Sequence, residues 1–323
     1  MTFARRRISL TLELTNNTQT NQPNTFVESA TNTVTLSDVR TSVRIQNSGA
    51  PANATATVQV WGLTPSLMNQ LATLGMVFNL VPKNILTIHA GDDIAGMATV
   101  FTGTIFSAAT DYERQPDVPL IFACQAGAAD ATINAPPSSF QGSSDVATIM
   151  SGFARQMNLG FENNGVSLSL SNAYFSGSIR QQAARCASDA GISWGVVNGN
   201  TLAIWPKGGN RNTPNVPIIS ADTGMVGYPA FTPQGIIVKT LFSPLIAFGG
   251  LVQVESSVLS GIAAVQQQNQ TGASPLSTSS TFPSQWAVNK LDLALDSLLP
   301  KGQWLSMIYA YNPGYARALM PPA

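Results

Sequence analysis

Residues that could do acid–base or metal chemistry are few in this sequence. His89 is the only histidine, and the alternation of apolar residues around it predicts a position in the middle of a strand. A catalytic triad or a histidine metal site needs partner residues, and the sequence supplies none for His89. We therefore expect His89 to have a structural role.

Acidic residues gather in two stretches that we interpret as turns. Asp92 and Asp93 are adjacent and could bind Ca²⁺, although two such acids in a turn are usually solvated. Asp111, Glu113 and Asp117 are close together, yet they are no better placed for acid–base work than other loop acids. The sequence has no phosphate-binding loop, no dinucleotide-binding glycine motif and no HExxH motif. We expect no enzymatic activity, no metal and no cofactor.

The cysteines, the basic cluster and the tryptophans have structural explanations. Cys124 and Cys186 lack metal-ligand spacing and a redox CxxC motif, so buried free thiols are expected, with a disulfide as the alternative. The run from Arg5 to Arg7 could meet an acidic partner or form a solvated start of the chain. The tryptophans lie in or next to predicted strands, which favours core positions over a ligand platform: Trp61, Trp194, Trp205, Trp286 and Trp304.

Composition favours a subunit of an assembly. The chain has 323 residues, 44% of them hydrophobic, which is enough for two or three domains with a sizeable core. Only 10% of residues are charged, against about 25% in ordinary soluble domains, so Asn, Gln, Ser and Thr must cover the surface. Such a surface is poorly protected from association. A secreted, Thr- and Asn-rich protein is the alternative.

Charge and hydropathy exclude other classes. The 16 basic and 16 acidic residues balance, which argues against nucleic-acid binding as the main task. The N-terminal stretch has no apolar core or cleavage site of a signal peptide. No apolar run reaches the length of a transmembrane helix. We expect a chain that is synthesised in a cytoplasm and does not insert into a membrane.

Three parts follow from the pattern of predicted elements. Residues 1–127 alternate polar and apolar positions in several runs, which predicts a first β-barrel with one short helix started by Thr64 and Pro65. Residues 128–210 hold two helical patterns, started at Ser144-Asp145 and at Ser176-Gly177-Ser178, and an Asn-Gly hairpin signal at Asn198, which predict a small α/β module. Residues 211–323 predict a second β-barrel with a flexible insertion at 266–284.

The stretch from Val216 to Ser256 organises the chain. It predicts strands at residues 235–241 and 251–255, separated by a break at Pro244. No side chain in this stretch is set up for chemistry, and we interpret it as closing a β-barrel and presenting its edge. The candidate residues for contact between subunits alternate along these two strands: Ile236, Val238, Thr240, Val252 and Val254. The loop 266–284 or the tail 312–323 is expected to contact a partner protein.

Several motifs resemble one known family. A strand runs into Gly62-Leu63 before a short helix, and a strand pair runs through residues 85–91 and 100–105. Residues 120–127 end in a Cys-x-Ala-Gly pattern, and the order of glycines and prolines from Gly224 to Ser256 follows. In this order and spacing the sequence resembles the baseplate hub proteins of contractile-tailed bacteriophages, over nearly the whole chain.

The resemblance implies a mainly β (α+β) fold with two tail-tube-like antiparallel barrels and a small α/β module between them. It further implies a homotrimer that forms a pseudo-sixfold ring in the virion baseplate. The partners would be the tail tube protein, the central spike protein, the tape measure protein and baseplate wedge proteins, with DNA only in transit through the channel.

Two other functions remain open at this level. A receptor- or carbohydrate-binding tail protein would expose aromatic residues on one face. A hydrolase of cell walls would need a cleft with two carboxylates about 5–9.5 Å apart. Neither arrangement can be placed on the sequence.

Overall fold

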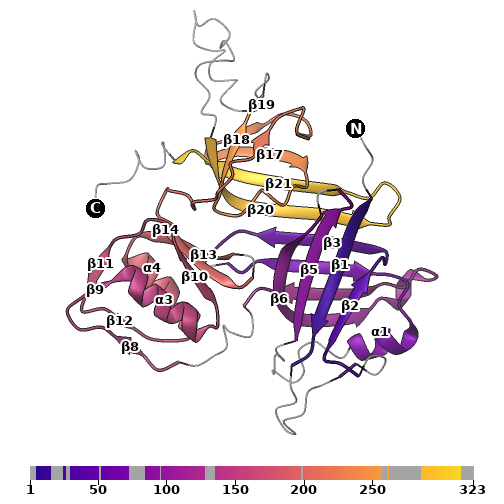
Figure 1. Cartoon of the computed structure of the whole chain (residues 1–323), viewed down its shortest axis with the longest axis horizontal. Coiled ribbons are helices and arrows are strands. Elements are labelled where there is room, and N and C mark those ends of the chain that lie inside the picture. Colours follow the sequence, from indigo (N-terminus) through magenta and orange to yellow (C-terminus); the bar gives the residue numbers. More distant parts are fainter. Residues whose placement is uncertain are drawn as a thin grey trace, which may run out of the picture.

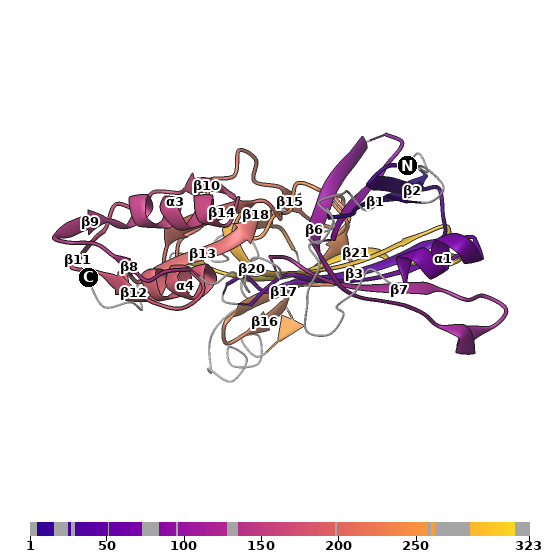
Figure 2. The same cartoon turned by 90° about the horizontal axis from the view of Figure 1, so that it is seen from below.

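A computed structural model describes residues 5–15, 25–26, 30–50, 52–72, 84–94, 96–127, 135–197, 199–256, 260–261 and 285–313. Strands dominate these residues, and the helices are few (Figures 1 and 2). The expected mainly β class is therefore confirmed. The predicted insertion at 266–284 lies outside the described residues, as does the tail after Pro313.

The N-terminal strands alternate buried and exposed side chains, as the sequence predicts. They are β1 (Arg6–Glu13), β2 (Thr33–Ser37), β3 (Thr41–Asn47), β4 (Thr55–Val60), β5 (Ile85–Asp92), β6 (Gly96–Thr110) and β7 (Leu120–Gln125). Helix α1 (Pro65–Leu71) begins where Thr64 Oγ1 accepts the Leu67 N–H at 3.3 Å, and a 3-10 turn, η1 (Tyr112–Arg114), precedes β7. We call residues 5–127 the first β region.

The C-terminal strands form what we call the second β region, residues 214–313. They are β15 (Ile218–Ile219), β16 (Ala230–Thr232), β17 (Gly235–Leu241), β18 (Leu251–Val254), β19 (Ser260–Gly261), β20 (Gln285–Ser297) and β21 (Trp304–Tyr311). Both β regions join in a single sheet, in the order β19-β16-β17-β21-β20-β3-β4-β7-β6-β5-β1-β2.

The sheet differs from the expected pair of barrels, because no closed barrel occurs among the described residues. β20 is long enough to pair with β21 on one edge and, from Leu291 to Ser297, with β3 on the other. The β3 edge is therefore satisfied by a strand about 250 residues away. Sequence periodicity shows that a strand exists but does not show which strand lies beside it.

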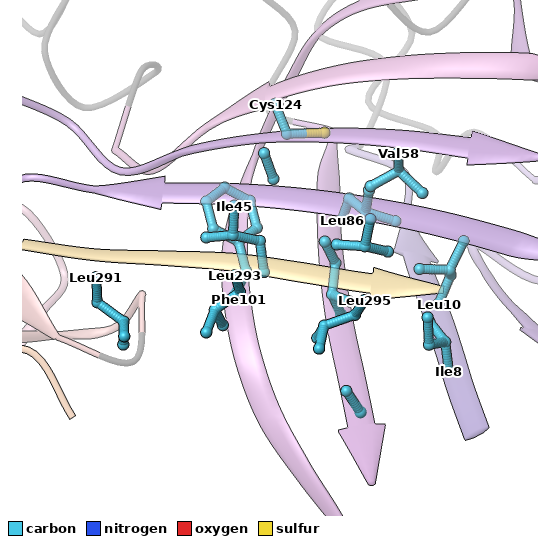
Figure 3. Packing of buried hydrophobic residues seen from close by; sticks show 14 of the residues in the cluster. Ile8, Leu10, Ile45, Val58, Leu86, Phe101, Cys124, Leu291, Leu293 and Leu295 are labelled. Atoms are coloured by element: carbon cyan, nitrogen blue, oxygen red, sulfur yellow. The ribbon is translucent and has the colours of Figure 1, made fainter. Parts of the chain in front are cut away.

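One hydrophobic core fills the space between the two halves of this sheet. Alternate residues of β20, from Leu291 through Leu293 to Leu295, point toward strands that cross it, including β1 with Ile8 and Leu10 (Figure 3). The remaining members come from both β regions, so the two regions share their apolar burial. That burial is the main stabilising term for the sheet.

The residues between these strands form a separate α/β module, residues 135–213, beside the sheet (Figure 1). Its helices are α3 (Val146–Gln156), capped by Asp145, and α4 (Ile179–Asp189), capped by Ser178 in a capping box. Its main sheet has the order β10 (Gly160–Asn163), β14 (Thr201–Pro206), β13 (Ile192–Val197). Two short pairs complete it: β8 (Ser138–Ser139) with β12 (Tyr174–Phe175), and β9 (Ser143–Asp145) with β11 (Ser169–Ser171).

The two predicted helices and the hairpin of the module are confirmed. Val197 pairs with Thr201 on either side of the Asn-Gly turn, and Gly199 has the positive φ of 74° that this turn requires. Asn198 itself lies outside the described residues. The exact domain boundaries at residues 127 and 210 stay a prediction.

Candidate functional site

The acids and the histidine of the described chain do not form a reaction site. His89 lies in the middle of β5, and its Nδ1 contacts Thr99 Oγ1 at 3.1 Å. Asp92 accepts the Ile94 N–H at 2.8 Å, and Asp93 pairs with Arg7 at 2.8 Å. Among the residues that the structure describes, no group of three or more His, Cys, Asp or Glu side chains could hold a metal ion.

The second acidic cluster caps a turn. Asp111 accepts the Glu113 N–H at 3.3 Å and pairs with Arg114 at 2.9 Å. Asp117 pairs with Arg40 at 2.8 Å. These carboxylates order the loop between β6 and β7, so the structure gives them a role in folding and no pairing for acid–base work.

Both cysteines are buried and free, as expected. Burial raises the pKa of the Cys124 thiol to about 12. Burial, with a smaller contribution from the charge of Asp189, raises the pKa of Cys186 to about 12. At neutral pH both side chains are thiols without nucleophilic thiolate character.

The arginine run is exposed to solvent and also makes contacts within the chain. Arg5 pairs with Asp38 at 3.3 Å, and Arg6 lies over the Trp304 ring at 5.7 Å. Of the five tryptophans, four are buried, and Trp61 is half-buried beneath the Arg40 guanidinium. The expectation of core tryptophans is thus confirmed for four of them.

The five candidate interface residues lie inside the chain. Their side chains are 1–3% exposed and belong to the core or its polar lining: Ile236, Val238, Thr240, Val252 and Val254. Their strands are also paired on both edges. β17 lies between β21 and β16, with residues 224–226 continuing the β16 side, and β18 lies between β20 and β15. An interface role for these residues therefore stays a prediction, and these side chains have no exposed surface with which to contact a second subunit.

An open edge lies elsewhere, at β2. Within the described residues β2 pairs with β1 alone. The Leu14 N–H donates to Asn32 O, which fixes the hydrogen-bonding pattern of this antiparallel pair. The backbone N–H and C=O groups of Val34 and Leu36 therefore point toward β1. Those of the alternate residues Thr33, Thr35 and Ser37 point away from it. The strand carries no charge and no proline, which are the usual protections of an edge. The uncharged Thr-Val-Thr-Leu-Ser run could be recognised in the sequence as a strand, but nothing in it indicated that this strand lies at an edge of the sheet.

Two partly buried ion pairs lie where parts of the chain meet. At the pairing of β20 with β3, Asp296 accepts hydrogen bonds from Arg44 Nη1 and Ser42 Oγ, both at 2.7 Å, and from the Gln303 N–H at 2.7 Å. Burial alone would raise the pKa of Asp296, but these hydrogen bonds and the Arg44 charge lower it below its usual value.

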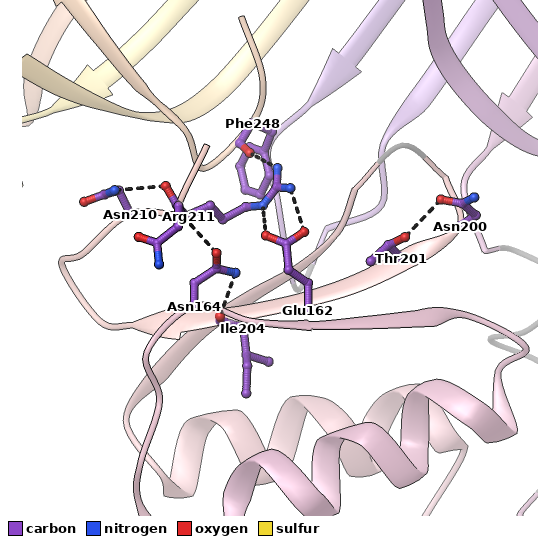
Figure 4. A network of polar contacts seen from close by, with 9 residues as sticks. Glu162, Asn164, Asn200, Thr201, Ile204, Asn210, Arg211 and Phe248 are labelled. Atoms are coloured by element: carbon purple, nitrogen blue, oxygen red, sulfur yellow. Dashed lines mark hydrogen bonds and ion pairs between the residues drawn. The ribbon is translucent and has the colours of Figure 1, made fainter. Parts of the chain in front are cut away.

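The second ion pair joins two residues of the module, beside its contact with the Phe248 loop of the second β region (Figure 4). Arg211 Nη2 contacts Glu162 Oε2 at 2.9 Å and Arg211 Nε contacts Glu162 Oε1 at 3.2 Å, in a bidentate arrangement. Burial would raise the pKa of Glu162, but the hydrogen bonds from Arg211 and Asn164 and the Arg211 charge lower it.

Comparison of the sequence with known families gives a match to one family. Residues 19–263, more than half of the chain, match the baseplate hub gp41 family. The chain belongs to the baseplate hub gp41 family. The resemblance to baseplate hub proteins is confirmed, and this hub chain is a structural tail protein by family.

Solved structures with the same fold are also tail proteins. The hub chain is similar to the tail protein from Neisseria meningitidis MC58, with a TM-score of 0.58, 8% identity, and coverage of 96% of this chain and 98% of that one. It is similar to the 43 kDa tail protein of prophage MuSo2 from Shewanella oneidensis, with a TM-score of 0.54, 9% identity, and coverage of 95% and 99%.

A third similar structure is the E. coli c3393 protein, a component of the type VI secretion system described as similar to the T4 tail proteins gp27 and gp5. The TM-score is 0.53 at 11% identity, with coverage of 85% of this chain and 73% of that one. Identities this low show a shared fold. None of the curated proteins compared with the hub chain matches it. In the described part of the chain, no helix has the length and apolar character needed to cross a membrane.

Proposed function

We propose that this hub chain forms a homotrimeric, pseudo-sixfold ring in the baseplate of a contractile tail, where it joins the tail tube to the central spike. The tape measure protein and later DNA pass through the ring. The observation that carries the proposal is the family match over residues 19–263. The site of action is the virion tail, and the chain has no enzymatic role in this proposal.

A physical route to the ring is pairing between strand edges. An open, uncharged edge favours association, because no second strand pairs with it among the described residues and only Thr33 O has a side-chain partner there, Thr31 Oγ1 at 2.7 Å. In the proposal, β2 supplies the edge that meets a second copy. The strands β17 and β18, with Ile236 and Val252 in the core, support that contact by fixing the sheet. The resemblance implies two tail-tube-like barrels in each chain. Three chains would then present six barrels, which would match a sixfold tube.

The proposed partners are the tail tube protein, the central spike protein, the tape measure protein and baseplate wedge proteins. The likeness to the type VI secretion component, itself described as similar to two T4 tail proteins, supports a position beside a spike. Residues 266–284 and 312–323 are the proposed contacts to such partners.

Light scattering on the purified chain, alone and with the adjacent spike protein, tests this function. The expected mass is that of three chains, in one condition or both. A chain that stays monomeric with every tail protein would overturn the ring, and receptor binding would become the leading function.

A substitution in β2 tests the edge separately. The outward N–H of Thr35 makes Thr35→Pro compatible with the β1 ladder, since no backbone hydrogen bond to β1 is lost. The contact of Thr35 Oγ1 with Thr11 Oγ1 at 3.4 Å is lost in Thr35→Pro and in Thr35→Val alike. We expect Thr35→Pro to abolish the trimer, and Thr35→Val, which keeps the N–H, to preserve it. A folded Thr35→Pro variant that is still trimeric would exclude β2 while leaving the ring intact.

A further inference from the structure

The α/β module has its own hydrophobic core. Residues of α3, α4 and the β13–β14 hairpin pack together in a cluster that is separate from the core of the large sheet. A third, small cluster lies where the module meets the second β region, and it consists of Val197, Ala203, Trp205 and Phe248. The module therefore has its own apolar burial and touches the sheet through a small contact.

Phe248 enters this contact from the loop that joins β17 to β18. Its ring packs edge-on against Trp205 of β14, with centroids 5.9 Å apart. Two glycines make the room: a Cβ on Gly195 of β13 would lie 2.9 Å from the ring, and a Cβ on Gly49 of the β3–β4 turn would lie 2.2 Å from it. The first β region, the module and the second β region thus all contribute to this contact. The Phe248 ring fits there because residues 49 and 195 are glycines without a Cβ.

Arg211 fastens the loop that carries Phe248. The arginine side chain is 10% exposed and holds Glu162 of β10 in the bidentate pair described above. Its Nη1 donates to Phe248 O at 3.0 Å, and its backbone N–H donates to Gly249 O at 2.7 Å (Figure 4). One residue therefore ties the module on one side and the Phe248 loop on the other.

The connector beside this contact is irregular and is held by hydrogen bonds on both sides, among them Asn212 N–H to Asn164 Oδ1 and Tyr311 OH to Gly209 O. Residues 207–217 form no helix or strand, and Gly208 has a φ of 69°. Glycine in such a segment absorbs backbone rotation at low cost. Other contacts from the module to the first β region are small: Gly199 lies against Thr102 of β6, and Arg180 Nη2 donates to Ala52 O at 3.4 Å.

We propose that Phe248 and Arg211 form a latch that holds the α/β module in one orientation, and that opening the latch lets the module turn as a folded body. The module's separate core keeps it folded in the open state. The buried charge pair is stable only while both partners are in place, because a lone buried charge is costly. The latch is a property of the single chain and does not depend on the trimeric ring.

Single-molecule energy transfer between the module and the sheet tests the latch. Labels on Thr57→Cys in β4 and Ser188→Cys in α4 occupy exposed positions, and the native thiols are buried and do not react. The labelled full chain is diluted with unlabelled chain, so that pairs within one chain are read. We expect one narrow transfer efficiency for the parent, and a shifted or broadened one for Phe248→Ala and for Arg211→Met.

Controls separate release from unfolding. Arg114→Met removes an exposed ion pair outside the module and should leave the transfer efficiency unchanged. The double variant Arg211→Met/Glu162→Gln leaves no lone carboxylate and should still release the module. In the latch variants, hydrogen exchange should show α3 and α4 as protected as in the parent. In the energy-transfer experiment, Phe248→Leu should give an effect intermediate between the parent and Phe248→Ala.

Two outcomes would overturn the latch. One is a parent-like transfer efficiency in folded Phe248→Ala and Arg211→Met. The other is loss of α3 and α4 protection, or failure to fold, in all latch variants including Phe248→Leu, because the module would then depend on the sheet for its own folding.

Discussion

Two junctions of this hub chain each contain an Arg–carboxylate ion pair, but the structure around the pair differs. At the first, β20 pairs with β3 over seven residue pairs, and Asp296 with Arg44 lies beside that ladder over a shared core. At the second, Glu162 with Arg211 lies beside a four-residue apolar cluster between two separate cores. At the first junction the partly buried ion pair joins two strands of one sheet. At the second the ion pair lies within the module, and Arg211 reaches the second β region through hydrogen bonds to Phe248 O and Gly249 O.

The comparison bears on how a baseplate hub can combine rigidity and adjustment. The β20–β3 junction connects the first and second β regions by backbone hydrogen bonds, which cannot open without unfolding the sheet. The module junction has no such ladder among the described residues. We expect substitutions at the first to change the stability of the whole chain, and those at the second to change orientation first.

The largest effect is expected for Leu295→Ala. Leu295 is fully buried on β20 at the first junction, so truncation removes apolar burial and leaves a cavity in the shared core. We expect the free energy of unfolding to fall by about 2–5 kcal/mol, measured by urea denaturation. Met307→Ala, on the partly exposed face of β21, is the control and should cost less than about 0.5 kcal/mol. Comparable losses for both variants would contradict a shared core at this junction.

A moderate effect is expected for Asp296→Asn. The change removes the charge that accepts from Arg44, Ser42 and the Gln303 N–H, while it keeps the shape of the side chain. Since Arg44 is 44% exposed, solvent screens part of the pair, and we expect a loss of about 1–2 kcal/mol in one cooperative transition. Two separate transitions, one for each β region, would show that the junction couples them less than the ladder implies.

Acid pH should reproduce part of this effect. Asp296 and Glu162 both have a pKa below the usual carboxyl value, so each stabilises the fold above its unfolded pKa of about 4, and that stability is lost as pH falls through the folded pKa. Unfolding curves between pH 7 and pH 2 should show this decline. Asp296→Asn should be less sensitive to pH than the parent, and an equal decline in both would exclude Asp296 as a source.

The smallest effect is expected for Asp145→Ala at the start of α3. Asp145 accepts the Thr148 N–H at 2.8 Å, and this hydrogen bond, with one from the Thr148 side chain, lowers the pKa of Asp145. Loss of the cap should cost about 1 kcal/mol and raise hydrogen exchange in the module alone. Asp145→Ser, which can still cap, is the control. Increased exchange in β20 or β3 would show that module and sheet unfold together.

The caps and the tight turn could be predicted because their causes are local. Thr64, Asp145 and Ser178 accept hydrogen bonds from backbone N–H groups a few residues ahead, and the Asn-Gly turn sets the register of β13 and β14 within six residues. From one histidine and scattered acids the sequence also predicted no enzymatic activity, and this stays a prediction.

The candidate interface was harder to predict. The alternation through Val238 and Val252 correctly indicated strands, but alternation does not tell whether the apolar side faces the chain's own core or a neighbour. That decision depends on which strands lie alongside, and β16, β21, β15 and β20 all come from other parts of the second β region.

What the sequence determined by itself is therefore the longer helices and strands and the mainly β class, because each depends on residue types and on neighbours a few positions away. Only the tertiary structure decided that β20 lies beside β3, that β2 is left as the open edge, and that Phe248 fits between Gly49 and Gly195. These contacts join residues far apart in the chain. Packing selects them among many sterically similar alternatives, and no local pattern encodes that selection.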